Sequence, residues 1–381
     1  MPPNEKITVL YICGSGFSGA EKSLLDLITS VADYVNPIVL VPSIGETFEV
    51  FTNRGIHCIC HRYSDSWIPF GHWIKFFVFP WRLKTIKYFR YDIPCVYFVK
   101  GITANQHVDL IHTNYSLTAF GTLLSRRVNL PHVWHVREYL IRPYINGRIF
   151  MGRFWLRKMI NNASARIVSS TPCSDFWQLK KDNTYMLNDA VRRVKECCYI
   201  KEKQKYVLFC SSIVRESKGI FTAIHAYSLS GLNALGIRLR VVGKKTCEIE
   251  KQISSMVSEY KCADMVDFIP EQKNVKPLFA NAMAYINPSV SEGMGRTTAE
   301  AMFYGCPVVA RASGGTLDLI KHGETGWLFN TEKECAELLN LVCSTSQEQI
   351  ILRAQEFAKQ NLSIENYGDK IMEVYHKVLN N

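Results

Sequence analysis

Short runs of β-branched and aliphatic residues alternate along this chain with longer segments of helical periodicity. In the first half, the pattern predicts strands at 7–13, 37–42, 56–60, 108–112, 131–136 and 166–169. In the second half, it predicts strands at 206–209, 238–243, 265–269, 283–286 and 307–310. Strands that alternate with helices favour an α/β architecture with parallel sheets.

A polar, charge-rich stretch at 188–204 separates the two series of strands and is predicted to be a linker. The 381 residues are enough for two or three domains. We expect two nucleotide-binding-type halves, an N-terminal domain at 1–187 and a C-terminal domain at 205–360, followed by a helix at 361–381.

The composition, 47% hydrophobic and 21% charged, is ordinary for a globular protein, but the net charge of +11 is not. Such a charge favours an anionic partner: a membrane, a nucleic acid or a phosphorylated substrate. The thirteen cysteines lack metal-type spacing, which favours free thiols in a reducing cytosol. No signal peptide is apparent, and no apolar run is long enough to predict a transmembrane helix.

The segment 291–329 places Glu292 and Glu300 on either side of a glycine-broken turn, Gly293-Met294-Gly295, that leads into a helix. A strand, a glycine turn and a helix N-terminus together form an anion site, because unpaired amides point at the ligand. Side chains lean toward the N-terminus of their helix, so Glu300 is expected to point to the same mouth as Glu292. Carboxylates at such a site are expected to hold hydroxyl groups of the ligand. An alternative is that Thr297 and Glu300 form a helix capping box.

The first predicted strand is followed by Gly14-Ser15-Gly16-Phe17-Ser18-Gly19, which has the spacing of a dinucleotide-binding fingerprint. That fingerprint expects an acidic residue at the end of the second strand, where this chain has Pro42 and Ser43. An oxidoreductase is therefore disfavoured. A tight turn that binds no ligand is the other alternative.

Arg215 and Lys218 follow the first strand of the second half. Cations there would stabilise the charge that grows on a departing diphosphate. The chain has no Asp-x-Asp pair of the kind that a metal-dependent transferase uses, so no metal is expected. A solvated basic loop is the alternative.

His112 and His135 lie at predicted strand ends in the first half, where open α/β sheets build their sites. Either histidine could instead be a structural hydrogen-bonding residue. His112, Arg137 and Glu138 are candidates for contacting an acceptor. Arg137 and Glu138 could instead pair with each other.

The stretch 67–100 is rich in aromatic and basic residues, which is typical of interfacial membrane binding. The residues expected to enter the interface are Trp73, Phe76, Phe77 and Trp81. A core helix with a basic face is the alternative, and no motif supports nucleic-acid binding.

The segment 291–329 resembles the Glu-x7-Glu region of retaining GT-B glycosyltransferases, and specifically of glycosyltransferase family 4 (group 1). The likeness continues through Glu300-Ala301-Met302, Gly305-Cys306-Pro307-Val308, Gly314-Gly315 and Gly323-x-x-Gly326. It implies the GT-B fold, with two Rossmann-like domains facing each other across a cleft and a C-terminal tail that packs on the N-terminal domain. Two positions depart from the family: Arg296 replaces a common aliphatic residue, and Asp318 a common glutamate.

By this resemblance, Glu300 would hold the donor's ribose hydroxyls, Glu292 the sugar hydroxyls, and His135 the donor sugar. Glu292 and His135 are the expected catalytic residues. The remaining donor-binding residues would be Gly16, Phe17, Ser18, Gly19, Arg215, Lys218, Met294, Gly295, Arg296 and Thr297.

The implied activity is retaining, hexosyl-type and metal-independent sugar transfer from a nucleotide-diphosphate donor, with no further cofactor. The expected acceptor is a glycan or lipid-linked molecule in surface polysaccharide synthesis, and the expected location is the cytoplasmic face of a membrane. The alternative is a catalytically silent, membrane-attached protein that binds sugar nucleotides; Glu292, Glu300, Arg215 and Lys218 argue against it.

Overall fold

The structure is a computed structural model that describes residues 6–69, 87–139, 147–149 and 152–380. Its chain divides into two compact units, one formed by Met1–Ala190 with Ile364–Asn381 and the other by Val191–Ser363. The membrane-contact candidates Trp73, Phe76, Phe77 and Trp81 lie outside the described residues.

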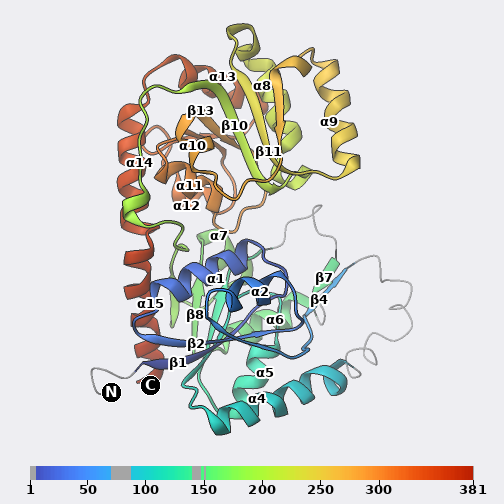
Figure 1. The fold of residues 1–381 in the computed structure, drawn as a ribbon, viewed down its shortest axis with the longest axis vertical. Coiled ribbons are helices and arrows are strands. Elements are labelled where there is room, and N and C mark those ends of the chain that lie inside the picture. Colours follow the sequence, from blue (N-terminus) through green and yellow to red (C-terminus); the bar gives the residue numbers. More distant parts are fainter. Residues whose placement is uncertain (1–5, 70–86, 140–146, 150–151, 381) are drawn as a thin grey trace. The chain divides into compact units, whose positions relative to one another are not determined.

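The first unit is the blue and green part of the ribbon in Figure 1, together with the red helix α15. It is built on a seven-stranded parallel sheet in the order β3-β2-β1-β5-β6-β8-β9. Its strands are β1 (Ile7–Ile12), β2 (Val35–Val41), β3 (His57–Cys60), β5 (Leu110–Thr113), β6 (His132–Val136), β8 (Ala165–Val168) and β9 (Thr184–Met186). Beside this sheet, β4 (Trp67–Pro69) pairs antiparallel with β7 (Gly147–Ile149). The reversal of strand order on the two sides of β1 is the Rossmann arrangement.

Helices cover both faces of this sheet. Successive side chains of β1 point to opposite faces, so the strand contributes to a separate core on each face. The helices of the unit are α1 (Gly19–Ser30), α2 (Glu46–Thr52), α4 (Ile93–Asn105) with the π-helical turn η2 (Tyr88–Asp92) before it, α5 (Phe120–Val128), α6 (Gly152–Asn161), α7 (Thr171–Trp177) and α15 (Ile364–Leu379). Val9 and Tyr11 share one core with α1 and α15, whereas Leu10 and Ile12 share another with α4 and α5.

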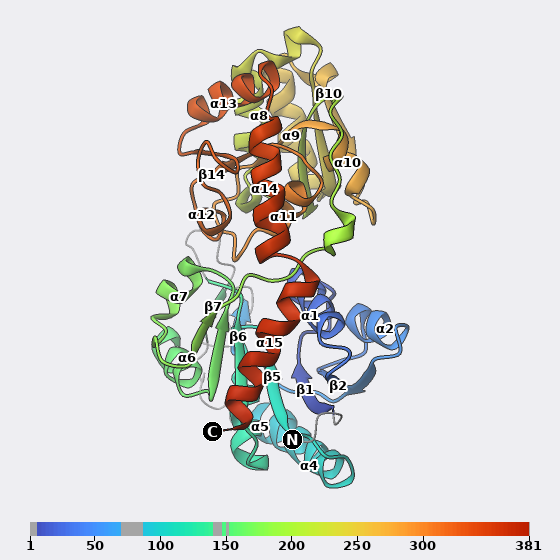
Figure 2. The same ribbon diagram turned by 90° about the vertical axis from the view of Figure 1, so that its left-hand side faces the viewer.

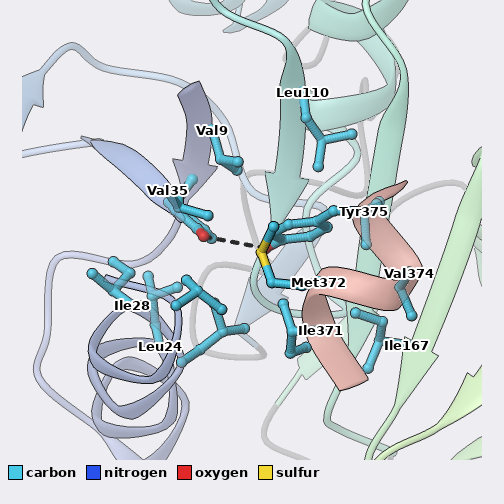
Figure 3. Packing of buried hydrophobic residues seen from close by; sticks show 14 of the residues in the cluster. Val9, Leu24, Ile28, Val35, Leu110, Ile167, Ile371, Met372, Val374 and Tyr375 are labelled. Atoms are coloured by element: carbon cyan, nitrogen blue, oxygen red, sulfur yellow. Dashed lines mark hydrogen bonds between the residues drawn. The ribbon is translucent and has the colours of Figure 1, made fainter. Parts of the chain in front are cut away.

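The C-terminal helix α15 is part of the first unit although it follows the whole second unit in sequence (Figure 2). Ile371, Met372 and Tyr375 bury their side chains in the core that α1 and the sheet also form (Figure 3). Gly368 brings α15 so close to α1 that an added Cβ would lie 2.3 Å from the Ser30 carbonyl oxygen. The sequence predicts a break near Asn361, and the structure ends α14 there and begins α15 at Ile364.

The second unit has a six-stranded parallel sheet in the order β12-β11-β10-β13-β14-β15, which is again the Rossmann arrangement. Its strands are β10 (Gln204–Ile213), β11 (Arg238–Lys244), β12 (Val266–Ile269), β13 (Ala282–Asn287), β14 (Val308–Arg311) and β15 (Trp327–Phe329). Its α-helices are α8 (Ile220–Ser230), α9 (Cys247–Glu259), α10 (Lys276–Asn281), α11 (Arg296–Phe303), α12 (Thr316–Leu319), α13 (Glu332–Ser344) and α14 (Glu348–Asn361).

The two faces of the second sheet are also both covered. Val207 and Phe209 pack with α8, α9 and α13, whereas Tyr206 and Leu208 pack with α10, α11 and α14. The two units are therefore Rossmann-like α/β domains, as the alternation of strands and helices predicts.

The stretch 188–204, predicted to be a linker, is divided between the units. Its residues up to Ala190 belong to the first unit, and those from Val191 onward belong to the second. Val191 is fully buried in the core beside α11, so hydrophobic packing anchors a segment whose polar composition suggests solvent exposure. The short strands β4, β7, β9 and β15 were not predicted.

All thirteen cysteines are described and are free thiols. Among the described residues, no helix is both long and apolar enough to cross a membrane.

The contact between Gly368 and Ser30 gives a stability prediction. Gly368→Ala should destabilise the protein by about 1–3 kcal/mol, because the new methyl group has no space against a backbone carbonyl. Gly101→Ala, inside α4 with no atom within 4 Å of an added Cβ, is the matched control and should be neutral or stabilising. Urea unfolding of both variants checks this, and an unchanged Gly368→Ala protein would contradict the close contact.

Candidate functional site

The glycine turn of the second unit connects β13 to α11. Gly295 is the N-cap of α11 and has φ +98, a conformation that other residues rarely adopt. Gly315 packs against this turn so closely that an added Cβ would lie 2.3 Å from the carbonyl oxygen of Gly293. The Gly315 amide also donates to the Glu292 carbonyl oxygen over 2.8 Å. The downstream glycine pair therefore holds the turn in place.

Glu292, in this turn, forms an ion pair with Lys218. Lys218 Nζ lies 2.8 Å from Glu292 Oε1, and the two side chains are 25% and 12% exposed. The loops that carry them are joined directly, since the Val290 amide donates to the Ser217 carbonyl oxygen over 3.3 Å. Gly219, with φ +76, permits this approach, because an added Cβ would lie 2.3 Å from the Pro288 carbonyl oxygen.

Glu300, in α11, forms an ion pair with Arg192. Arg192 Nη2 lies 2.6 Å from Glu300 Oε1, and the two side chains are 23% and 13% exposed. The capping-box alternative for Glu300 is wrong, because α11 begins at Arg296 with Gly295 as its N-cap. Arg192 was not predicted as a site residue, and no local motif marks it.

Two buried polar contacts fix the first turn of α11 on β13. The Tyr285 hydroxyl donates to Thr297 Oγ1 over 2.7 Å, and Asn287 Nδ2 donates to Thr298 Oγ1 over 2.8 Å. Burial raises the pKa of Tyr285 well above its usual value, so the phenol stays a proton donor. The helix N-terminus is thereby fixed relative to the sheet.

The other donor-binding candidates of this unit are Arg215, in the loop after β10, and three residues at the start of α11. Arg215 precedes the 3-10 turn η4 (Glu216–Lys218); its side chain is exposed and makes no hydrogen bond or ion pair within the described part of the chain. Met294 is buried, and Arg296 and Thr297 are half-buried at the start of α11. The structure thus brings Lys218 to Glu292 and leaves Arg215 in solvent.

In the first unit, the glycine loop before α1 is held by Glu21. The Glu21 carboxylate accepts from the amides of Gly14 and Ser18 over 3.2 and 3.0 Å. The amides of Gly16 and Phe17 donate to no atom of the described residues, and an added Cβ at Gly16 or Gly19 would meet nothing within 4 Å. The loop therefore presents open backbone at the positions that the sequence predicts. The sequence did not predict that the Glu21 side chain would hold this loop.

His112 and His135 lie on β5 and β6, and both side chains are fully buried. His112 Nδ1 lies 2.8 Å from the Tyr375 hydroxyl, and His135 Nδ1 lies 3.1 Å from Arg137 Nη2. Nε2 of each ring makes no hydrogen bond with a described residue. Burial lowers the pKa of both histidines well below 6.5, so both rings are neutral near neutral pH.

Arg137 and Glu138 do not pair with each other. Arg137 forms a buried ion pair with Asp189 and donates from Nε to Asn114 Oδ1 over 3.2 Å. Glu138 accepts from the Ser116 amide over 2.7 Å. Asp189 was not predicted as part of this cluster, because it lies in the stretch taken for a linker.

Among the described residues, no group of three or more His, Cys, Asp or Glu side chains could hold a metal ion. The expectation that the reaction needs no metal stays a prediction.

Part of the chain matches a known family. Residues 197–359 match the family model of glycosyl transferases group 1. An uncharacterized glycosyltransferase of Haemophilus influenzae is 29% identical over 178 residues, which cover 43% of this chain and 49% of that protein. The chain thus spans about half the length of that curated relative. The N-acetyl-alpha-D-glucosaminyl L-malate synthase of Bacillus anthracis is 20% identical over 318 residues, 78% of this chain and 81% of that protein.

Solved structures share the fold. The structure of Anabaena Alr3699/HepE in complex with UDP has a TM-score of 0.77 at 18% identity and covers 98% of this chain and 100% of its own. Sucrose-phosphate synthase from Thermosynechococcus elongatus has a TM-score of 0.76 at 18% identity, over 98% and 100% of the two chains. The chain therefore has the GT-B fold.

The buried histidines of the first unit give a prediction on pH. Burial lowers the pKa of His132 to about 3, so the unfolded chain takes up a proton below pH 6.5 that the folded chain does not. The free energy of unfolding should therefore fall as the pH drops below about 6.5, by roughly 1.4 kcal/mol per pH unit for each such histidine.

His132→Gln should remove one such contribution from the slope, whatever it does to the stability at pH 7. Urea unfolding between pH 6.5 and 5, monitored by tryptophan fluorescence, measures how the free energy of unfolding changes with pH in wild type and in His132→Gln. Equal slopes for these two proteins would rule out a neutral, buried His132.

Proposed function

We propose that this protein is a glycosyltransferase that moves a sugar from a nucleotide-diphosphate donor to an acceptor. The observation that carries the proposal is the pair of carboxylates, Glu292 and Glu300, at the glycine-broken N-terminus of α11, each held by one cation. The match of residues 197–359 to glycosyl transferases group 1 and the GT-B fold of the chain support it.

In this proposal, the second unit binds the donor. Glu300 accepts hydrogen bonds from the ribose hydroxyls and Glu292 from the sugar hydroxyls, because carboxylates accept hydrogen bonds and hydroxyls donate them. Lys218 and Arg215 bind the diphosphate and stabilise the charge that develops as it leaves. The exposed Arg215 makes no hydrogen bond or ion pair with the described residues, so its side chain is available to bind the diphosphate. The HepE structures are complexes with UDP, with UDP and glucose, and with UDP-glucose, which supports a nucleotide-sugar donor.

We further propose transfer of a hexose with retained anomeric configuration and without a metal. The cations Lys218 and Arg215 supply positive charge near the glycine turn, as a divalent ion does in other transferases. The donor-sugar role of His135, and the acceptor roles of His112, Arg137 and Glu138, stay predictions from the sequence.

A panel of nucleotide sugars, assayed for binding and for slow hydrolysis, tests the proposed reaction. Glu292→Ala should lower kcat/KM for the accepted donor by about 100-fold, because a positioned, charged hydrogen-bond acceptor is lost. Glu259→Ala, an exposed acid at the end of α9, is the matched control and should behave as wild type.

Two outcomes would contradict the proposal. If the protein binds no nucleotide sugar, it has no donor of the proposed class. Tight binding without turnover in the presence of any glycan or lipid-linked acceptor would favour the silent, sugar-nucleotide-binding alternative instead.

We also propose that the first unit binds an anionic membrane surface and that the acceptor is lipid-linked, as in surface polysaccharide synthesis. The net charge of +11 supports this. In the described part of the aromatic and basic stretch, Phe89 and Tyr97 are 64% and 70% exposed, beside the exposed Arg90. Exposed aromatic side chains next to cations suit an interface with acidic headgroups.

Vesicle co-sedimentation tests the membrane proposal. Replacing Trp73, Phe76, Phe77 and Trp81 by serine should weaken binding to vesicles containing anionic lipid by more than about 10-fold, since each aromatic ring adds apolar burial. Tyr34→Ser, an exposed aromatic residue outside this stretch, is the control. Co-sedimentation of the fourfold variant at the wild-type level would exclude these four residues as the contact.

A further inference from the structure

Arg192 is the cation that pairs with Glu300, and each of its guanidinium nitrogens has a different acceptor. Nη2 donates to Glu300 Oε1 over 2.6 Å, Nε to the Tyr304 hydroxyl over 2.5 Å, and Nη1 to the Val191 carbonyl oxygen over 2.8 Å. Three divergent hydrogen bonds fix the plane of the guanidinium group, which a lysine ammonium could not reproduce.

The backbone of Arg192 is fixed on the same core that carries α11. Val191 is fully buried with Met302 and Phe303 of α11, and its amide donates to the Leu362 carbonyl oxygen over 2.9 Å. Arg192 itself forms a β-bridge with Ser363. Both ends of the ion pair are therefore anchored inside the second unit.

The ion pair occupies only one oxygen of the Glu300 carboxylate. Arg192 bonds Oε1, and Oε2 accepts no hydrogen bond from the part of the chain that the structure describes. An arginine can grip both oxygens of a carboxylate with a fork of two N–H groups, and here it does not. Oε2 thus keeps its lone pairs for a ligand.

The charge of Arg192 also matters at this place. A bare carboxylate beside the diphosphate of a bound nucleotide would repel it. A partly exposed ion pair contributes little to stability. Its larger effect is on the orientation and charge of the carboxylate.

We propose that Arg192 is a positioning residue for Glu300: it neutralises the carboxylate and directs Oε2 at the ribose hydroxyls of the donor. This inference rests on the proposed function, in which Glu300 holds the ribose. Tyr304 supports the arrangement by accepting from Nε of Arg192.

The test compares affinities for UDP, ADP and GDP with those for their 2′-deoxy counterparts by calorimetry. Wild type should bind its preferred ribonucleotide about 10-fold more tightly than the deoxy form, because a charged hydrogen bond is lost. Glu300→Gln and Arg192→Met should each reduce this ratio to about 2-fold or less. The double variant should reduce it no further, since both changes act on one interaction.

Arg193→Met is the matched control, because it removes a cation from the neighbouring position without touching Glu300. It should keep the wild-type ratio. Arg192→Lys retains the charge without the three directed bonds. Compared with Arg192→Met, it should recover affinity for the ribonucleotide but only part of the ribonucleotide-to-deoxynucleotide affinity ratio. Tyr304→Phe should reduce this ratio to an intermediate value. A purely structural role would change the melting temperature and leave the ratio unaltered.

The outcomes separate the inference from the proposed function. If Glu300→Gln loses the ratio and Arg192→Met keeps it, the role of Arg192 is overturned and the donor site stands. If wild type binds no nucleotide, or if Glu300→Gln keeps the ratio, the ribose role of Glu300 is overturned, and the inference with it. If Arg192→Met does not fold, Arg192→Lys and Tyr304→Phe decide: a wild-type ratio in both overturns the inference.

Discussion

The central constraint on the second unit is that two carboxylates, Glu292 and Glu300, have lost most of their contact with water at one helix N-terminus. Withdrawing a charge from water is costly unless a partner neutralises it. The parallel sheet makes such partners available, because loops from different strands meet at the carboxyl edge of the sheet. Lys218 comes from such a loop, the one after β10. Arg192 instead comes from the segment that precedes this strand, which the buried Val191 and a β-bridge to Ser363 anchor in the second unit. The close approaches at Gly219 and Gly315 then hold the loops together.

The first unit handles buried polar groups differently. Its histidines on β5 and β6 are kept neutral by burial. The buried ion pair of Arg137 with Asp189 is also contacted by the Tyr367 hydroxyl, at 3.3 Å from Asp189 Oδ1. Tyr367 and Tyr375 both come from α15. The C-terminal helix therefore contributes polar contacts as well as apolar packing to a domain formed mostly by residues that precede it by more than a hundred positions.

Much of the fold follows from local pattern. The predicted strands coincide with all the strands of the two parallel sheets except β9 and β15. The central strands are continuous apolar runs buried on both faces, whereas the edge strands β3 and β12 are only partly buried. The short strands β4, β7, β9 and β15 have three residues each and too little periodicity to stand out. The glycine turn before α11 could be predicted because Gly295 has a positive φ, so the residue type itself reports the backbone conformation.

The sequence by itself determined the two α/β halves, the glycine turn and the residues Glu292, Glu300, Lys218 and Arg215 as candidates, because each depends on spacing within a short segment. Only the tertiary structure decided the partners. Glu300 pairs with Arg192, and Arg137 with Asp189, across more than fifty residues of sequence in each case. A polar stretch at 188–204 contains both partners and looks like a linker, since nothing in its composition says which charges will be buried. That choice depends on which segments the sheets bring together, and such long-range contacts leave no local spacing in the chain.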